Sequence, residues 1–190
     1  GRAAIKAAKA AHYVNAGTIE FLLESNEQFY FMEMNTRIQV EHPVTECVTG
    51  IDLIKEQIRI AAGKKLSYRQ QDVRIGGHAI ECRINAENPK EQFRPSPGLI
   101  TDVYFPGGKG VRIDTAVYNG YEVPAYYDSM LAKLIVHAKT RKEAISKMRS
   151  ALGEVIIEGV DTNVDYQYEI MNHPDYQAGN VDIEFISEKM

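Results

Sequence analysis

Two glutamates and an asparagine are spaced so that together they could hold a divalent cation. Glu20 lies in the apolar run 18–24, Glu33 lies in the apolar run 29–34, and Asn35 comes soon after. Carboxylate and amide oxygens suit Mg²⁺ or Mn²⁺, and Mg²⁺ usually keeps water and phosphate oxygens in its shell. The competing interpretation is that one glutamate faces solvent because the two runs pair in another register.

A loop rich in charged and polar side chains follows the second run. Arg37, Gln39, Glu41 and His42 are gathered directly before Pro43. Arginine offers a planar fork for a carboxylate-like or phosphate anion, and a glutamate can serve as a base where its surroundings tune it. We therefore expect an anionic substrate beside the metal site. His42 is expected to be a structural hydrogen-bond partner.

A hairpin must position these residues. The four polar residues between the two runs predict an antiparallel pair of strands with a four-residue loop. If Glu24 faces Phe29, Glu20 lies directly opposite Glu33, and such a pair of like charges calls for a compensating cation. Side chains alternate along a strand, so a second set should form a core on the other face: Ile19, Phe21, Leu23, Tyr30, Met32 and Met34.

The remaining elements follow from propensity, periodicity and caps. Helices are expected over 2–14, 44–48, from Asp52 to Gly63, from Thr140 with Ile145, Met148 and Leu152 inward, and over 162–171. Strands are expected over 79–84, 99–105, 111–117, 130–138 and 155–157, with the tail 181–186 as an edge strand. The stretch 106–110 lacks the spacing of a phosphate-binding loop and is expected to be a hairpin turn.

The chain is expected to form an α+β fold in two parts. Gly76 and Gly77 give the clearest boundary signal, because a glycine pair favours a hinge or turn. The expected division is a half-domain over 1–66, a connector over 67–77 and a second domain over 78–190. The half-domain is too small to bury its sheet alone.

Composition excludes several classes of function. A net charge of −4 does not favour a general nucleic-acid binder. No apolar run approaches the ~20 residues that cross a bilayer, and no signal peptide is evident, so a cytoplasmic protein is expected. Cys47 and Cys82 lack CxxC spacing and are expected to be buried free thiols.

The stretch EMNTRIQVEHPVTE, with Glu20 upstream, resembles the catalytic signature of biotin carboxylases. These are ATP-grasp enzymes of acetyl-CoA carboxylase and its relatives. Three further segments, GHAIECRINAE, PSPG and PAYYDSMLAKL, extend the resemblance along the chain. It implies the C-terminal half of an ATP-grasp domain, followed by a biotin carboxylase C-terminal domain with a mixed, mainly antiparallel sheet and helices.

The resemblance implies a nucleotide and metal site. Glu20, Glu33 and Asn35 would hold Mg²⁺ or Mn²⁺ bridging the phosphates of ATP. Leu22 and Ile183 would line the nucleotide pocket. The metal ligands match the set that the hairpin pattern indicates independently.

The resemblance also implies residues for the two reaction stages. Arg37, Gln39 and Val40 would seat bicarbonate, and Glu41 would be the general base that deprotonates it. Arg83 would stabilise the enolate-like oxygen of deprotonated biotin. Arg37, Glu41 and Arg83 are therefore the expected catalytic residues.

Two of these roles have structural alternatives. By strand alternation alone, Arg83 is a surface cation paired with Glu81 or Glu87. Asp128, in the YYDSM segment, would lie near biotin by resemblance, but it also suits a capped turn with packed tyrosines.

The implied enzyme is an ATP-dependent ligase that serves fatty acid synthesis. Its partners would be bicarbonate, a biotin carboxyl carrier protein and carboxyltransferase subunits. The enzyme would be a homodimer that binds neither nucleic acid nor membrane. The fragment is expected to be inactive alone. The alternatives are the equivalent region of a pyruvate or propionyl-CoA carboxylase and a non-catalytic dimerisation module over 77–190.

Overall fold

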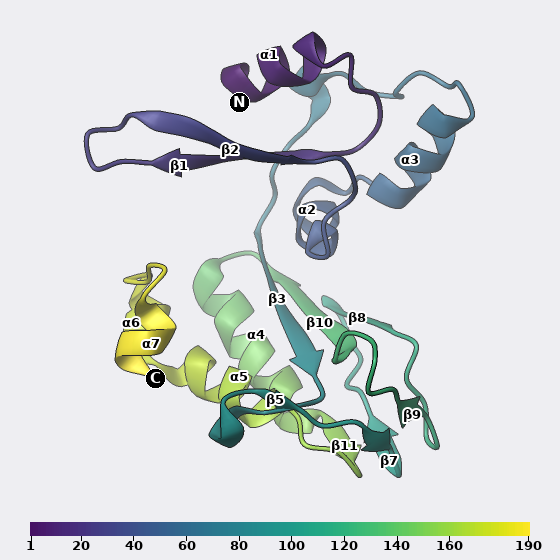
Figure 1. Cartoon of the computed structure of the whole chain (residues 1–190), viewed down its shortest axis with the longest axis vertical. Coiled ribbons are helices and arrows are strands. Elements are labelled where there is room, and N and C mark those ends of the chain that lie inside the picture. Colours follow the sequence, from purple (N-terminus) through teal and green to yellow (C-terminus); the bar gives the residue numbers. More distant parts are fainter. The chain divides into compact units, whose positions relative to one another are not determined.

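The computed structural model describes residues 1–190 and has an α+β fold. It divides into two compact units, Gly1–Ile75 and Gly76–Met190 (Figure 1). Each unit has its own sheets and helices. None of the helices is long and apolar enough to cross a membrane.

The first unit contains one hairpin and a small set of helices. Its elements are α1 (Arg2–Ala10), β1 (Thr18–Leu23), β2 (Phe29–Asn35), α2 (His42–Thr49), α3 (Leu53–Ala61) and the short 3-10 helix Gln70–Asp72. Pro43 lies in the first turn of α2, and the left-handed Gly50 ends that helix. Asp52 caps α3 by accepting a hydrogen bond from the backbone N of Lys55 at 2.8 Å.

Helix α1 is shorter than the sequence predicts. It ends at Ala10, and His12 takes a left-handed conformation with φ of 51°. The backbone N of Tyr13 then donates to the carbonyl of Ala8 at 3.0 Å, which satisfies a carbonyl at the end of the helix. The expected extension to residue 14 is therefore wrong, because the chain turns there toward the hairpin.

The hairpin has a longer loop than predicted and contains a bulge. Leu23 pairs with Phe29, so five residues, 24–28, join the strands, and the expected pairing of Glu24 with Phe29 is wrong. The backbone N of Glu24 instead donates to the carbonyl of Gln28 at 2.8 Å. The register then shifts between Glu20 and Phe21.

The face expected to form the hairpin core is right for Ile19 and Met34, which are cross-strand partners, but wrong toward the loop, where Tyr30 and Met32 do not pair with Phe21 or Leu23. Phe21 makes edge-to-face contacts with Phe29 and Phe31, at ring centroid distances of 5.3 and 6.4 Å. Because cross-strand partners share a face, the bulge changes which side chains of β2 lie beside Phe21. Several large apolar side chains of the hairpin are exposed: Leu22, Leu23, Phe29, Tyr30, Phe31 and Met32. The helices of the first unit leave these side chains exposed.

The second unit contains the buried core of the chain. Its helices are α4 (Arg141–Glu154), α5 (Val164–Asn172), α6 (Pro174–Ala178) and α7 (Phe185–Lys189), with a 3-10 turn at Pro89–Glu91. Its strands are β3 (His78–Asn85), β4 (Glu87–Asn88), β5 (Arg94–Pro95), β6 (Gly98–Leu99), β7 (Asp102–Tyr104), β8 (Val111–Thr115), β9 (Glu122–Val123), β10 (Met130–Ala138) and β11 (Ile156–Glu158). The main sheet is antiparallel, and β10 lies between β3 and β8.

One face of the main sheet packs on α4. The alternation predicted for β3 is confirmed, since Ile80, Cys82 and Ile84 are all buried in one cluster. Helix α4 contributes the residues of one stripe: Ala144, Ile145, Met148, Ala151 and Leu152. Complete burial of each large aliphatic side chain contributes ~1.5–3 kcal/mol, so this layer is the main source of stability. A smaller cluster surrounds Ile100.

Two predicted strand arrangements in this unit are wrong. The segments around β7 and β8 are expected from the sequence to form one hairpin, but β7 pairs with β11 and β8 pairs with β10. The tail is expected to be an edge strand, but its last residues form α7, because Phe185 is buried and its ring packs edge-to-face on His173 at 5.1 Å. Both cysteines are free; Cys82 is buried and Cys47 is half-buried.

Candidate functional site

Glu20 and Glu33 converge on the side-chain amide of Asn35. The two glutamates are direct cross-strand partners in the hairpin. Asn35 Nδ2 donates to Glu20 Oε1 at 3.0 Å and to Glu33 Oε1 at 2.8 Å. The amide therefore holds together two carboxylates that would otherwise repel each other.

This cluster suits a hard divalent cation. Its carboxylate and amide oxygens are the ligand type that Mg²⁺ prefers. Nowhere does the chain gather three or more His, Cys, Asp or Glu side chains in a metal-binding group. The shell of a cation at this cluster would therefore need the amide oxygen of Asn35, together with water or substrate oxygens, beside Glu20 and Glu33. Turning the Asn35 amide would present that oxygen.

Arg37 connects the carboxylate cluster to the loop that follows. Its NH2 group donates to Asn35 Oδ1 at 3.2 Å, and its NH1 group donates to Gln39 Oε1 at 3.3 Å. NH1 also donates to the carbonyl of Ile38 at 3.2 Å. The side chains of Asn35, Arg37 and Gln39 thus form one continuous chain of hydrogen bonds.

The loop borders a cavity of about 270 Å³. Arg37, Gln39 and Glu41 all line it. Gln39 Nε2 is buried and has no hydrogen-bond partner, which leaves a donor for an acceptor from outside the chain. The neighbouring Val40 is half-buried. A guanidinium, an unpaired amide donor and a carboxylate therefore share one small cavity, which suits a compact anion that must lose a proton.

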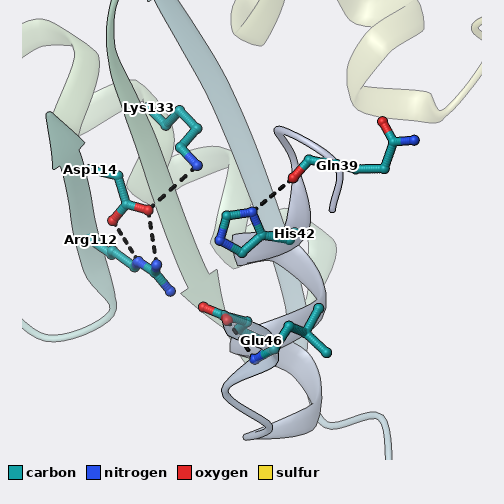
Figure 2. A network of polar contacts seen from close by, with 7 residues as sticks. Gln39, His42, Glu46, Arg112, Asp114 and Lys133 are labelled. Atoms are coloured by element: carbon teal, nitrogen blue, oxygen red, sulfur yellow. Dashed lines mark hydrogen bonds and ion pairs between the residues drawn. The ribbon is translucent and has the colours of Figure 1, made fainter. Parts of the chain in front are cut away.

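His42 fixes the start of α2 beside this cavity. Its Nδ1 lies 2.8 Å from the carbonyl oxygen of Gln39 (Figure 2). Because a carbonyl only accepts, Nδ1 carries the proton in this contact. The contact ties the loop to the first turn of α2, in keeping with the structural role expected for His42.

Arg83 lies on β3 of the second unit, on the face opposite Ile80, Cys82 and Ile84. Its cross-strand partner is Lys133 of β10, whose other partner is Asp114 of β8. The Arg83 side chain is exposed. Glu87, one of the partners considered for it, accepts hydrogen bonds from Ser129 Oγ and Asn85 Nδ2.

Asp114 compensates the positive charge on this face of the sheet (Figure 2). Its Oδ1 lies 2.7 Å from Arg112 Nε, and its Oδ2 lies 3.5 Å from Lys133 Nζ. Partial burial works to raise the pKa of Asp114, but hydrogen bonding and the charges of Arg112 and Lys133 outweigh it and lower that pKa.

Asn163 is a buried polar residue that sequence reasoning missed. It is 5% exposed. Its Oδ1 accepts from the backbone N of Asn85 at 2.9 Å, and its Nδ2 donates to the carbonyl of Arg83 at 3.1 Å. It therefore fixes the end of the strand that carries Arg83. In the sequence, only its position just before the start of α5 indicated a structural role for Asn163.

Asp128 occupies a turn before β10. Its Oδ1 accepts from the backbone N of Met130 at 2.8 Å, which is the capped turn considered from the sequence. Tyr126 and Tyr127 are 82% and 78% exposed, with ring centroids 5.2 Å apart. They are not packed into a core, so their aromatic surfaces remain accessible to a ligand.

The two residues expected to line a nucleotide pocket are both exposed. Leu22 is next but one to Glu20 along β1 and is 59% exposed. Ile183 lies just before α7 and is 100% exposed. Their contact with a nucleotide stays a prediction.

Two family models match this chain. The biotin carboxylase C-terminal domain matches residues 81–188. The ATP binding domain of the carbamoyl-phosphate synthase L chain matches residues 1–69. The first unit therefore carries part of an ATP-grasp domain, and the second unit carries the domain that the sequence resemblance implied.

Curated relatives match nearly the whole chain. Biotin carboxylase 1 of Bacillus subtilis is 57% identical over 187 residues, which cover 98% of this chain and 42% of the relative. A pyruvate carboxylase subunit of Methanothermobacter thermautotrophicus is 55% identical over 188 residues, which cover 99% of this chain and 38% of the relative. The chain thus spans about two fifths of the length of these relatives.

Solved structures agree with this assignment. The biotin carboxylase domain dimer of Hydrogenobacter thermophilus 2-oxoglutarate carboxylase, in complex with MgADP, ADP and bicarbonate, matches with a TM-score of 0.95 at 50% identity. The match covers 99% of this chain and 42% of that one. Family model, sequence identity and fold all lead to one conclusion: the chain belongs to the biotin carboxylase family.

Proposed function

We propose that this chain is the part of a biotin carboxylase that carries the metal-binding hairpin, the bicarbonate loop and the C-terminal domain. The intact enzyme would use ATP and bicarbonate to carboxylate biotin on a carrier protein. The observation that carries the proposal is the hydrogen-bonded chain from Asn35 through Arg37 to Gln39. It joins the paired carboxylates to the cavity lined by Glu41.

The hairpin would hold the metal and the phosphates. Glu20, Glu33 and Asn35 would be ligands for Mg²⁺, with Mn²⁺ as a substitute, and the cation would neutralise charge on the ATP phosphates. Leu22 and Ile183 would contact the nucleotide. The solved relative with MgADP and bicarbonate supports this pairing of ligands.

The loop would seat and activate bicarbonate. Arg37, the unpaired Nε2 of Gln39 and the Val40 segment would hold the anion, and the Glu41 carboxylate would take its proton. An oxygen of the resulting carbonate would attack the γ-phosphorus of ATP. A phosphorus–oxygen bond to the carbonate then forms as the bond to the ADP oxygen breaks, which gives carboxyphosphate and ADP.

The second unit would serve the biotin stage. Arg83 would stabilise the enolate-like oxygen of deprotonated biotin, whose ureido nitrogen accepts the carboxyl group as phosphate leaves. Asp128 and the exposed tyrosines before it would contact the same substrate. The Asn163 hydrogen bonds would hold the strand end that presents Arg83.

The physiological role is proposed more narrowly as acetyl-CoA carboxylation for fatty acid synthesis in the cytoplasm. The partners would be a biotin carboxyl carrier protein and carboxyltransferase subunits, and the enzyme would be a homodimer, as is the solved relative. The specific rival is pyruvate carboxylation, since a pyruvate carboxylase subunit is 55% identical. Assaying acetyl-CoA and pyruvate as acceptors, with the intact enzyme supplemented by its carrier protein and carboxyltransferase subunits, distinguishes these roles.

The decisive experiment is bicarbonate-dependent ATP hydrolysis by the intact enzyme. Glu41→Gln removes the proposed base and should lower the rate by ~10²–10⁴-fold. Glu27→Gln, in the exposed hairpin loop, is the matched control and should leave the rate unchanged. Equal activity of Glu41→Gln and the unmodified enzyme would refute the assignment of the base.

The isolated chain should not turn over ATP, because it contains about two fifths of its relatives' length. The same assay on the purified 190-residue chain tests this expectation. A rate near that of an intact biotin carboxylase would contradict it.

A further inference from the structure

The end of β3 and the start of β10 meet in an irregular part of the main sheet (Figure 1). Met130 is the cross-strand partner of Asn85, and the register shifts by one residue directly after this pair. Leu131 is therefore an extra residue in β10, and its side chain is buried in the smaller core cluster. A bulge interrupts the ladder, so contacts outside the regular ladder must hold the two strand ends together.

These strand ends carry the two side chains proposed for the biotin stage. Arg83 lies two residues before Asn85 on β3, and Asp128 lies two residues before Met130 in the turn that leads into β10. Both side chains are exposed, and they belong to segments far apart in the sequence. Their spacing therefore depends on how the turn and the end of β3 are fixed to each other.

Glu87 joins the turn to the end of β3 through one oxygen atom. Ser129 Oγ, next to Asp128, donates to Glu87 Oε1. Asn85 Nδ2 donates to the same oxygen at 3.2 Å. All three of these hydrogen-bonded side chains are half-buried. A carboxylate is a stronger acceptor than a neutral oxygen, so both contacts are favoured by its charge.

The backbone on both sides of Glu87 is also fixed. Ala86 is 1% exposed, and its N donates to the carbonyl of Ser129 at 2.8 Å. The carbonyl of Ala86 accepts from the backbone N of Ser96, also at 2.8 Å. Glu87 itself is the cross-strand partner of Pro95 in the pair of β4 and β5. The carboxylate is therefore carried by a segment with little freedom to move.

The Asn85 side chain has no second partner that could replace Glu87. Its Oδ1 is buried and accepts no hydrogen bond. Without the carboxylate, both polar groups of this amide would lack a partner, and a buried unpaired polar group is costly. Loss of Glu87 should therefore cause a rearrangement at the end of β3, two residues from Arg83.

We propose that Glu87 is a positioning residue for the biotin stage, because it fixes the Asp128 turn and the Arg83 strand relative to each other. Glu87 does not contact biotin in this proposal; it acts through the two side chains that do. The inference rests on the proposed function of Arg83 and Asp128. It adds a residue whose effect is confined to the second half of the reaction.

The test compares two activities of the intact enzyme: carboxylation of free biotin, and bicarbonate-dependent ATP hydrolysis without biotin. Glu87→Ala should lower kcat/KM for biotin by ~10–10²-fold, since small displacements of reacting groups have effects of that size. ATP hydrolysis without biotin should be unchanged, because the proposed metal and bicarbonate ligands belong to the first unit. Ser129→Ala should reproduce part of the loss, as it removes one of the two contacts.

Conservative and control variants separate positioning from general damage to the fold. Glu87→Gln keeps an acceptor oxygen at the same reach and should restore most of the activity with biotin. Glu87→Asp keeps the charge but is one methylene shorter, and should restore little. Glu154→Gln and Ser150→Ala, at exposed places on α4, are the matched controls and should change neither activity.

A double variant tests whether Glu87 acts through Arg83. Residues that act as a unit are not additive, so Arg83→Ala with Glu87→Ala should be little slower with biotin than Arg83→Ala alone. Losses that simply multiply would show that Glu87 acts independently of Arg83, and would overturn the proposal.

The remaining outcomes separate this inference from the proposed function. If Arg83→Ala slows biotin carboxylation and Glu87→Ala does not, Glu87 has no positioning role and the proposed function stands. If Glu87→Ala lowers both activities equally, its role is general stability, and the inference again fails alone. If Arg83→Ala itself has no effect with biotin, the proposed function of Arg83 is wrong, and this inference falls with it.

Discussion

Glu20 lies directly opposite Glu33 because Met32 bulges out of the ladder between β1 and β2. Phe21 pairs with Phe31, and the next pair is Glu20 with Glu33, so Met32 is the extra residue on its strand. Without the bulge, the loop end of the hairpin would place Glu20 opposite Met32. The two carboxylates would then no longer converge on Asn35.

Mn²⁺ should bind both strands of the hairpin at once. Titrating the chain with Mn²⁺ should broaden NMR signals around Glu20 and Glu33 together, because the two carboxylates converge on one amide. Replacing either residue with glutamine should weaken Mn²⁺ binding ~10-fold or more, since a charge-assisted contact contributes ~1.5–3 kcal/mol. Glu27→Gln is the control. Broadening around one strand alone would show that the register is different in solution.

Replacing Asn163 with alanine should destabilise the second unit by ~2–4 kcal/mol. The substitution leaves the backbone N of Asn85 and the carbonyl of Arg83 without their partner in a buried place. Urea unfolding of the chain measures the loss. Asn172→Ala is the matched control, because that side chain makes one exposed hydrogen bond, to the Tyr168 carbonyl. Similar losses for both variants would contradict the proposed role.

The ion pairs of Asp114 should make the second unit less stable in acid. The lowered pKa means that the contribution is complete above the carboxyl's ordinary pKa of 3.8 and is lost as the pH falls through the still lower folded value. The contribution should be small, at most ~1 kcal/mol, because the pair is partly exposed. Asp114→Asn should remove it at neutral pH and flatten this part of the profile below pH ~4. Urea unfolding of the chain and of Asp114→Asn at several pH values measures the size of this contribution and its loss in acid. If the two proteins lost stability equally as the pH falls, the acid sensitivity could not be assigned to Asp114.

Arg83→Ala should slow biotin carboxylation in the intact enzyme by ~10²–10³-fold, roughly 3–4 kcal/mol, if Arg83 is a preorganised donor to the biotin oxygen. The KM for ATP should hardly change, because the proposed metal ligands belong to the first unit. Arg83→Lys should restore little activity if the planar fork is needed. Lys90→Ala, an exposed cation of the same unit, is the control. Loss of ATP affinity in Arg83→Ala would argue against this division of roles.

The hairpin shows how far the sequence predicts this site. Apolar alternation correctly predicted both strands and the opposition of Glu20 and Glu33. The details of the pairing were wrong, because the loop is one residue longer and the bulge at Met32 cancels the difference. A bulge depends on which side chains pack across the strands, and local pattern alone does not report it.

The sequence also did not predict which strands pair when they lie far apart along the chain. The helix α4 and its buried stripe followed from a capping box and 3.6-residue periodicity, which are local signals. The pairing of β7 with β11 joins segments about fifty residues apart, and nothing in either short strand specifies its partner. Asn163 was missed for the same reason, since its two bonds reach back to residues 85 and 83.

The burial of Cys82 gives the second unit an internal reporter of its own unfolding. Removal from water, and then the nearby charge of Glu81, raise the pKa of this thiol to about 12. The reactive thiolate is therefore almost absent in the folded unit at neutral pH, and a reagent cannot reach the sulfur under α4. The half-buried Cys47 belongs to the other unit. The rates at which Cys82 and Cys47 are alkylated, followed by mass spectrometry, therefore report separately on the opening of the second and the first unit.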